Sequence, residues 1–227
     1  VAARSSLSDA LITLDAALRR GCPQEDVTSA IERLEQANHR GRAQRALELA
    51  DPWSESWLES LSRGRGIELG MPVPLCNVTL VFDTFEARVD ELWVELGVIG
   101  ECDGKGKYLL KGDVAEAYWR EKQRHENLEE NGFAVARWGT AHLLTDASTM
   151  LRRFHRAVQR QKSLREGWPA AVSAELRLIP GVSAPSRVVR EVERLQGLGY
   201  PVSIADPDPW RRSERITSLW TPTATSP

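Results

Sequence analysis

Three short stretches of strand-like sequence follow one another in the middle of the chain, and they constrain the fold more than any other feature. In 76–82 apolar and polar residues alternate, and two further stretches rich in apolar residues cover 86–94 and 97–102. The connections between the three stretches are short, which favours antiparallel pairing. The sequence therefore predicts a three-stranded meander.

Helical patterns flank this meander on both sides. Ser56 followed by Glu59 is a capping box at the start of the preceding helix, although Gly64 and Gly66 weaken that helix. The sequence predicts helices at about 55–68, 113–131 and 146–163, with a fourth strand at 133–138. The expected order is αβββαβα, an α/β (α+β) fold.

The segments before and after this region show no chemistry of their own. Residues 1–50 have helical apolar spacing, and we expect helices over 7–20, from Pro23 and over 42–50. After Trp168 the sequence predicts an amphipathic helix at 186–197, a short strand at 201–205 and then irregular, proline-containing chain. The expected organisation is a helical segment, a central domain and an extension of unknown role, over 1–50, 51–165 and 166–227.

Composition indicates in which cellular compartment the protein works and which partners it can have. The 227 residues carry a net charge of −2, so any basic surface for nucleic acid must be local. Three cysteines without metal-ligand spacing fit a reducing compartment better than a disulfide framework. No apolar run approaches the length that crosses a bilayer, and no secretion leader is present. We expect a cytoplasmic protein with no membrane partner.

The residues that carry chemistry are three acids at the ends of neighbouring strands. Asp90 lies near the end of the second strand, and Glu101 and Asp103 lie on the third, where their spacing puts them on one face. Carboxylates held together favour a cation between them, and oxygen ligands suit Mg²⁺ or Mn²⁺. Such a metal serves phosphodiester hydrolysis, in which Lys105 or Lys107 could offset developing charge. The alternative is that Asp103-Gly104 is only a hairpin corner.

The sequence around these acids resembles a known family. It is similar to the C-terminal domain of type IV toxin–antitoxin AbiEi-family antitoxin-domain proteins, a domain like the Vsr-like branch of the PD-(D/E)XK endonuclease superfamily. The resemblance covers roughly residues 8–160. The matching pieces are Ala50 to Ser56 with Glu59, Ala87 to Asp90 with Leu92-Trp93, Gly100 to Lys105 with Lys107-Tyr108, Glu121 to Arg124 with Glu126, and Asn131 to Trp138.

The resemblance implies a fold and a set of metal ligands. The superfamily fold is a helix, a three-stranded meander, a crossover helix and a further strand, as the residue patterns predict here. Its strand acids would be Asp90 and Glu101, and its helix acid Glu59. Asp103 stands where the superfamily usually has its catalytic lysine, so that role would pass to Lys105, Lys107 or Lys122. Glu91 is a further departure, because these relatives usually have an apolar residue there.

Three functions remain as hypotheses. The acids favour a metal-dependent DNA endonuclease for phage defence or repair, with phosphate contacts from a basic group of residues. The absence of a lysine at the position of Asp103 favours a catalytically inactive, DNA-binding regulator of antitoxin type. The near-neutral net charge favours a protein-interaction module. In the last case the N-terminal helices or the C-terminal extension would hold a partner or form a homodimer. The basic group is Lys122, Arg124, Arg152, Arg153 and Arg156, and its alternative is an ordinary solvated surface.

Overall fold

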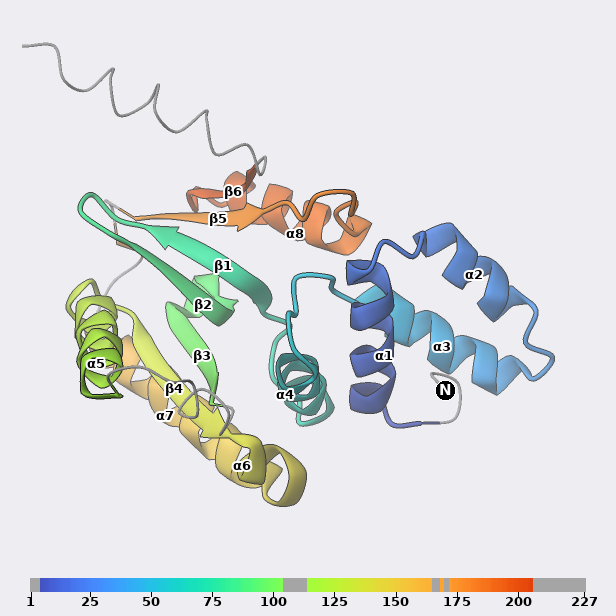
Figure 1. The fold of residues 1–227 in the computed structure, drawn as a ribbon, viewed down its shortest axis with the longest axis horizontal. Coiled ribbons are helices and arrows are strands. Elements are labelled where there is room, and N and C mark those ends of the chain that lie inside the picture. The colour runs from blue at the N-terminus through green and yellow to red at the C-terminus, as the bar shows by residue number, and fades with distance from the viewer. Residues whose placement is uncertain (1–4, 104–113, 165–167, 170–171, 206–227) are drawn as a thin grey trace, which may run out of the picture.

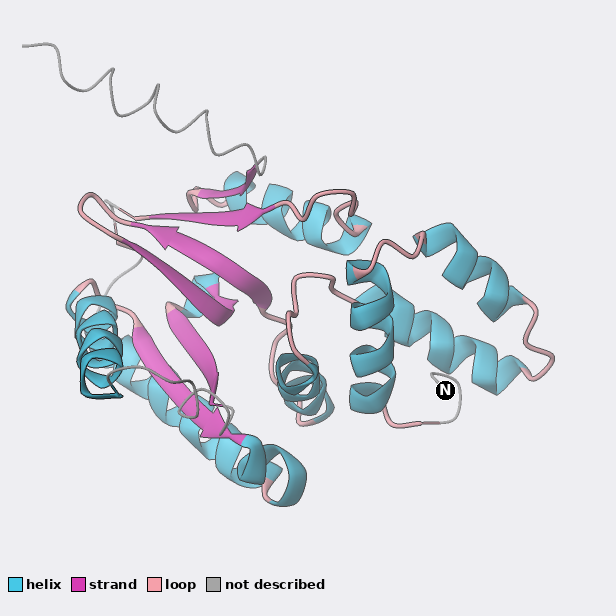
Figure 2. Cartoon of the chain, viewed as in Figure 1, coloured by secondary structure: helices cyan, strands magenta, loops and turns pink. Residues whose placement is uncertain are grey.

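The protein has a mixed α/β fold. The computed structural model describes residues 5–103, 114–164, 168–169 and 172–205. These residues form a six-stranded sheet with helices on both of its faces (Figure 2). The α/β class expected from the sequence is confirmed, while the irregular end expected after residue 205 lies outside the described residues.

The central elements follow in the expected order. A short 3-10 turn at Val94–Leu96 separates β2 from β3, and a short helix, α6, separates β4 from the next long helix; neither was expected. The other boundaries agree with the sequence patterns to within a few residues. The elements are α4 (Trp57–Glu68), β1 (Leu75–Val81), β2 (Glu86–Trp93), β3 (Val98–Asp103), α5 (Val114–Glu130), β4 (Ala134–Gly139), α6 (Thr140–Thr145) and α7 (Ala147–Leu164).

The sheet has mixed topology, with strand order β4-β3-β2-β1-β5-β6. The meander β1-β2-β3 is antiparallel, and β4 pairs parallel to β3 after the crossover through α5. On the other side of β1 the chain adds β5 (Ser173–Arg177), α8 (Ser186–Gly197) and β6 (Val202–Ala205). The C-terminal extension therefore completes the same sheet, through a strand, β5, that the sequence patterns did not indicate.

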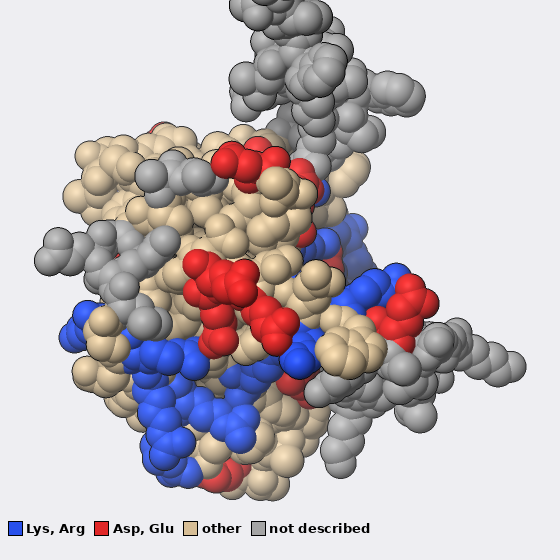
Figure 3. Space-filling model, turned by 90° about the vertical axis from the view of Figure 1, so that its left-hand side faces the viewer, with Lys and Arg blue, Asp and Glu red and all other residues tan. Residues whose placement is uncertain are grey.

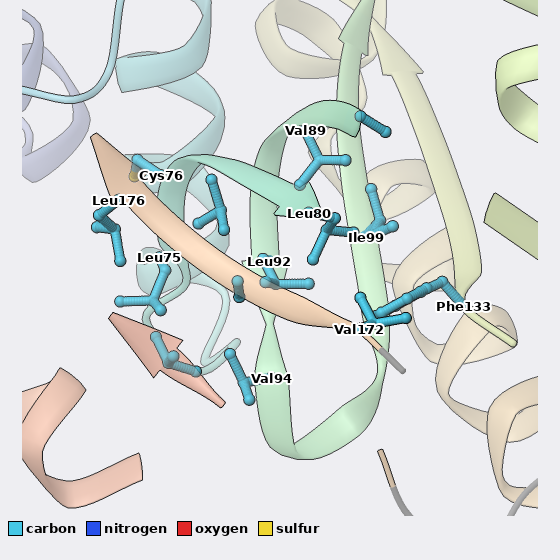
Figure 4. Packing of buried hydrophobic residues seen from close by; sticks show 14 of the residues in the cluster. Leu75, Cys76, Leu80, Val89, Leu92, Val94, Ile99, Phe133, Val172 and Leu176 are labelled. Atoms are coloured by element: carbon cyan, nitrogen blue, oxygen red, sulfur yellow. The ribbon is translucent and has the colours of Figure 1, made fainter. Parts of the chain in front are cut away.

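Two apolar layers sandwich the sheet. One cluster joins β1, β2 and β5 to α5 and α8, and Figure 4 shows Leu80, Val89, Ile99 and Val172 converging in it. The other cluster lies on the opposite face, where α4, α6 and α7 pack against β3 and β4.

The N-terminal helices form a third cluster beside the sheet. They are α1 (Leu7–Arg19), α2 (Gln24–Glu32) and α3 (Ala37–Leu49), which begins earlier than expected. In Figure 1 they lie to one side, and α1 packs against α4, which stands between them and the strands. No helix in the described ranges is long and apolar enough to cross a membrane.

A fully buried ion pair joins α1 to α4. Asp15 Oδ2 and Arg63 Nη2 are 2.6 Å apart, and both side chains are entirely buried. Arg63 also donates to the carbonyl of Leu49, and Asp15 Oδ1 accepts from the backbone N–H of Asp51. Asp51 in turn pairs with Arg187 of α8 at 2.8 Å. These charged groups therefore connect the N-terminal helices, α4 and the C-terminal extension.

Gly64 permits the close contact between α1 and α4. A Cβ atom at Gly64 would lie 2.5 Å from Ser8 Cα, closer than packed atoms can approach. We expect Gly64→Ala to lower the free energy of unfolding by about 1–3 kcal/mol, although alanine has the higher helix propensity. Urea unfolding measures this. Gly41→Ala in α3, where a Cβ meets nothing within 4 Å, is the control and should be neutral or stabilising.

Candidate functional site

A row of polar residues crosses the sheet where its hydrogen-bond ladders are interrupted. Cys76 pairs with Glu91 and Val78 with Val89, and the β1–β2 register skips the positions between them, Asn77 and Asp90. The β2–β3 ladder ends at Glu91 and Gly100, so the next residues along are Asp90 and Glu101. Asp90 thus stands at an interruption on both of its sides, and β2 separates from β3 there.

Both strands also change face at this row. Leu75 and Val78 lie in the same apolar cluster, and so do Val89 and Leu92. Residues three apart on a regular strand point to opposite faces, so β1 and β2 share a matched irregularity. Asn77 carries it in β1, with a left-handed φ of 49°. Such a backbone conformation in a non-glycine residue is costly and is frequent at functional sites.

Asn77 links this irregularity to α4. Its side-chain amide donates to Glu59 Oε2 at 2.6 Å and to the backbone carbonyl of Trp53 at 2.5 Å. Glu59 also accepts from Ser56 Oγ and from the backbone N–H of Glu55, as a capping-box residue does. Sequence reasoning missed Asn77; the signal was an asparagine, which tolerates left-handed backbone, inside a strand whose other residues favour extended structure.

The two strand acids have different partners. Asp90 Oδ2 accepts a hydrogen bond from the backbone N–H of Cys102 at 2.8 Å, across the gap between β2 and β3. Glu101 is almost fully buried, and its Oε1 lies 3.1 Å from Arg124 Nη1 of α5. Burial raises the pKa of Glu101, although the charge of Arg124 opposes this. The predicted DNA contact Arg124 is thus a partner of a predicted metal ligand.

Ion pairs continue from Glu101 along α5 to the edge strand β4. Arg124 Nη2 lies 2.8 Å from Glu121, and Arg137 of β4 lies 2.5 Å from the same Glu121 oxygen. Partial burial would raise the pKa of Glu121, but hydrogen bonds from Arg124 and Arg137 outweigh it and hold that pKa at about 2. Glu121 therefore stays ionised and fixes both arginines.

The remaining predicted ligands are less closely grouped. Asp103 ends β3 and is half-buried, while Lys105 and Lys107 lie outside the described residues. In the described ranges no three His, Cys, Asp or Glu side chains are arranged so that they could hold a metal ion. The structure brings Asp90 beside β3, but it gives Glu59 and Glu101 separate partners.

Glu91 lies next to Asp90 but is buried against α4. The residue is 1% exposed, and neither carboxylate oxygen is in a hydrogen bond of normal geometry with a described residue. Burial raises its pKa to about 8, with the Ser62 hydroxyl acting in the opposite direction. Glu91 is therefore mostly protonated at pH 7, and it is a neutral acid in a core position.

The predicted basic residues are distributed over two helices. Lys122 lies 3.6 Å from Glu126 and 5.0 Å from the centre of the exposed Trp119 ring. On α7, Arg152 contacts Thr149 and Asp146, while Arg153 donates to the backbone carbonyl of Arg137. Arg156 is exposed on α7. Figure 3 shows Lys and Arg side chains gathered on this face beneath a group of Asp and Glu side chains.

Comparisons with protein-family models, with curated proteins and with solved structures find no match for this chain.

Proposed function

We propose that this protein is a metal-dependent DNA endonuclease with a PD-(D/E)XK-type core. The observation that carries the proposal is the interruption of the β2–β3 ladder. Asp90 and Glu101 lie directly beside its last pair, Glu91 and Gly100. Asn77, with its left-handed backbone, lies at the same row, and strained backbone of this kind is frequent at functional sites. The order of α4, the meander, α5 and β4 agrees with the superfamily that the sequence resembles.

The donor chemistry at this row suits Mg²⁺ or Mn²⁺. Asp90, Glu101 and Asp103 offer carboxylate oxygens, the ligands that these cations prefer. The cation would supply an activated water and neutralise charge on the phosphate. Asp90 and Asp103 are the ligands proposed first, because Glu101 is engaged with Arg124. Lys105, Lys107 or Lys122 would offset the charge that develops on the phosphate.

The pairing of Glu101 with Arg124 favours a second candidate. A guanidinium that already neutralises the buried Glu101 does in part what a cation would do there. In this case the protein binds DNA as a regulator of antitoxin type, with its acids serving structure. The two candidates share the DNA partner and differ in whether a phosphodiester bond is cut.

Asp90→Asn tests the first candidate most directly. Asparagine can still accept from the backbone N–H of Cys102, so the strands should stay in place while the negative charge is lost. We expect the protein to cut DNA in Mg²⁺ or Mn²⁺, and the variant to cut at least about 100-fold more slowly. Plasmid nicking and cleavage of a labelled single strand measure the rates.

Asp83→Asn is the matched control, because Asp83 is an exposed aspartate in the turn before β2. It should cut at the rate of the unaltered protein. Binding of DNA without metal-dependent cutting would contradict the endonuclease and support the regulator. Cutting that Asp90→Asn leaves unchanged would place the reaction elsewhere in the chain.

A further inference from the structure

A hollow lined by arginines lies at the edge of the sheet, away from Asp90 and Glu101. It has a volume of about 350 Å³ and sits over β4, between α5 and α7. Its charged lining consists of Arg137 from β4 and Arg153, Arg156 and Arg160 from α7, with His125 from α5 beside them. Because β4 is the outermost strand, this hollow opens at the side of the molecule that Figure 3 shows.

Two of these arginines have a structural task. Arg153 donates to the backbone carbonyl of Arg137 at 2.6 Å, and Arg160 donates to that of Val135 at 3.2 Å. They therefore cover carbonyls on the free edge of β4, where another strand could otherwise pair. A guanidinium carries five N–H groups, so this task leaves most of their donors available.

The acids around the hollow do not neutralise it. Arg137 pairs with Glu121, and Arg160 lies 2.9 Å from Glu129. Glu121 is shared with Arg124, as described above. Arg156 lines the hollow, and its guanidinium has no ion pair or hydrogen bond with another described residue. Positive charge therefore remains in excess here.

Two buried polar atoms lie beside the hollow. Arg137 Nε and His125 Nδ1 are buried, and neither has a hydrogen-bond partner in the described parts of the chain. The Nε atoms of Arg63, Arg177 and Arg187 are in the same state, so the two atoms mark the packing of these side chains and the exposed guanidinium groups carry the binding. The pKa of His125 is lowered by burial and then by the charge of Arg137, as expected beside an arginine cluster.

We infer that this hollow binds a backbone phosphate of a DNA strand, with the guanidinium of Arg156 as its principal donor. The inference rests on the proposed function and adds a binding position to it. Arginine recognises phosphate through paired N–H donors.

The hollow is connected to Glu101 through the ion pairs of α5. Arg137 forms an ion pair with Glu121. Glu121 is also paired with Arg124, which in turn pairs with Glu101. The ion pairs therefore link the hollow to Glu101 through α5, while the arginines of α7 come from the other face of the sheet. The site positions the DNA backbone, and it takes no part in the reaction at the acids.

Arg156→Gln tests the site, because it removes an exposed charge with no structural contact. Anisotropy of a short fluorescein-labelled duplex in EDTA gives the affinity at several salt concentrations. We expect about fivefold to tenfold weaker binding near 0.1 M salt, and a salt slope smaller by about one. Arg156→Lys should keep most of the slope, and Arg190→Gln on the exposed side of α8 should change neither quantity.

Affinity and slope equal to those of Arg190→Gln would overturn the inference, and so would a failure of the unaltered protein to bind the duplex. The two proposals can fail separately. If Asp90→Asn abolishes cutting while Arg156→Gln binds normally, only the phosphate site is wrong. If no cutting occurs while Arg156→Gln binds weakly, only the endonuclease is wrong.

Discussion

Replacing Asp15 with asparagine is expected to lower the free energy of unfolding by about 3–5 kcal/mol. The substitution keeps the size of the side chain but leaves the buried guanidinium of Arg63 without its counter-charge. Removing one partner of a buried pair is far more costly than removing both, because the remaining charge has no solvent around it. Asp15 also accepts from the backbone of Asp51, and this contact would be weakened as well.

Urea unfolding followed by circular dichroism measures this loss. The double variant Asp15→Leu/Arg63→Met, which removes both charges, should recover most of the stability. Glu48→Gln is the control, since it breaks the exposed pair with Arg45 and should have little effect. A change of under about 1 kcal/mol in Asp15→Asn would show that Arg63 is satisfied without the carboxylate, against the expectation for a buried pair.

Glu91→Gln is expected to stabilise the protein by about 3 kcal/mol at pH 7 and to make its stability less dependent on pH. The carboxyl group of Glu91 has a pKa of about 8 in the folded chain, against an ordinary 4.5. Between these values the unfolded chain releases this proton and the folded chain keeps it. Stability is therefore lost as pH rises from 4.5 towards 8, and glutamine removes this loss.

The measurement is the free energy of unfolding of both proteins at pH 5, 7 and 8.5, in EDTA so that no metal ion contributes. The difference between them should be small at pH 5 and should grow by about 1.4 kcal/mol per pH unit until the folded pKa is passed. Glu86→Gln on the same strand, at an exposed position, is the control. A difference that does not change with pH would mean that Glu91 titrates normally in the fold.

The sequence patterns predicted the central elements because each has its own periodicity. The alternation of the meander and the long polar helix before Asn131-Gly132 are local signals, and the structure has both. The strand β5 has a weaker signal, since only Ala174 and Leu176 alternate with polar residues over Ser173–Arg177. Its strand state depends on pairing with β1, which lies far away in the sequence.

The candidate site was predictable only in part, for a similar reason. The placement of Asp90 beside Glu101 follows from strand register, and the structure places them at adjoining positions. The partner of Glu101, Arg124, comes from a helix whose angle to the sheet no local pattern fixes. The role of Asn77 depends on the backbone irregularity that β1 and β2 share, which appears only once both strands are paired.

The placement of β5 between β1 and β6 also has a consequence for how the chain folds during synthesis. Until β5 leaves the ribosome, β1 is an edge strand with free backbone groups, although its partner β2 and the next strand, β3, have already been made. The ribosome must synthesise α5, β4 and α7 before β5 can pair with the free edge of β1. During that interval a nascent chain is exposed to strand pairing with its neighbours, and chaperones that bind extended segments would act on β1.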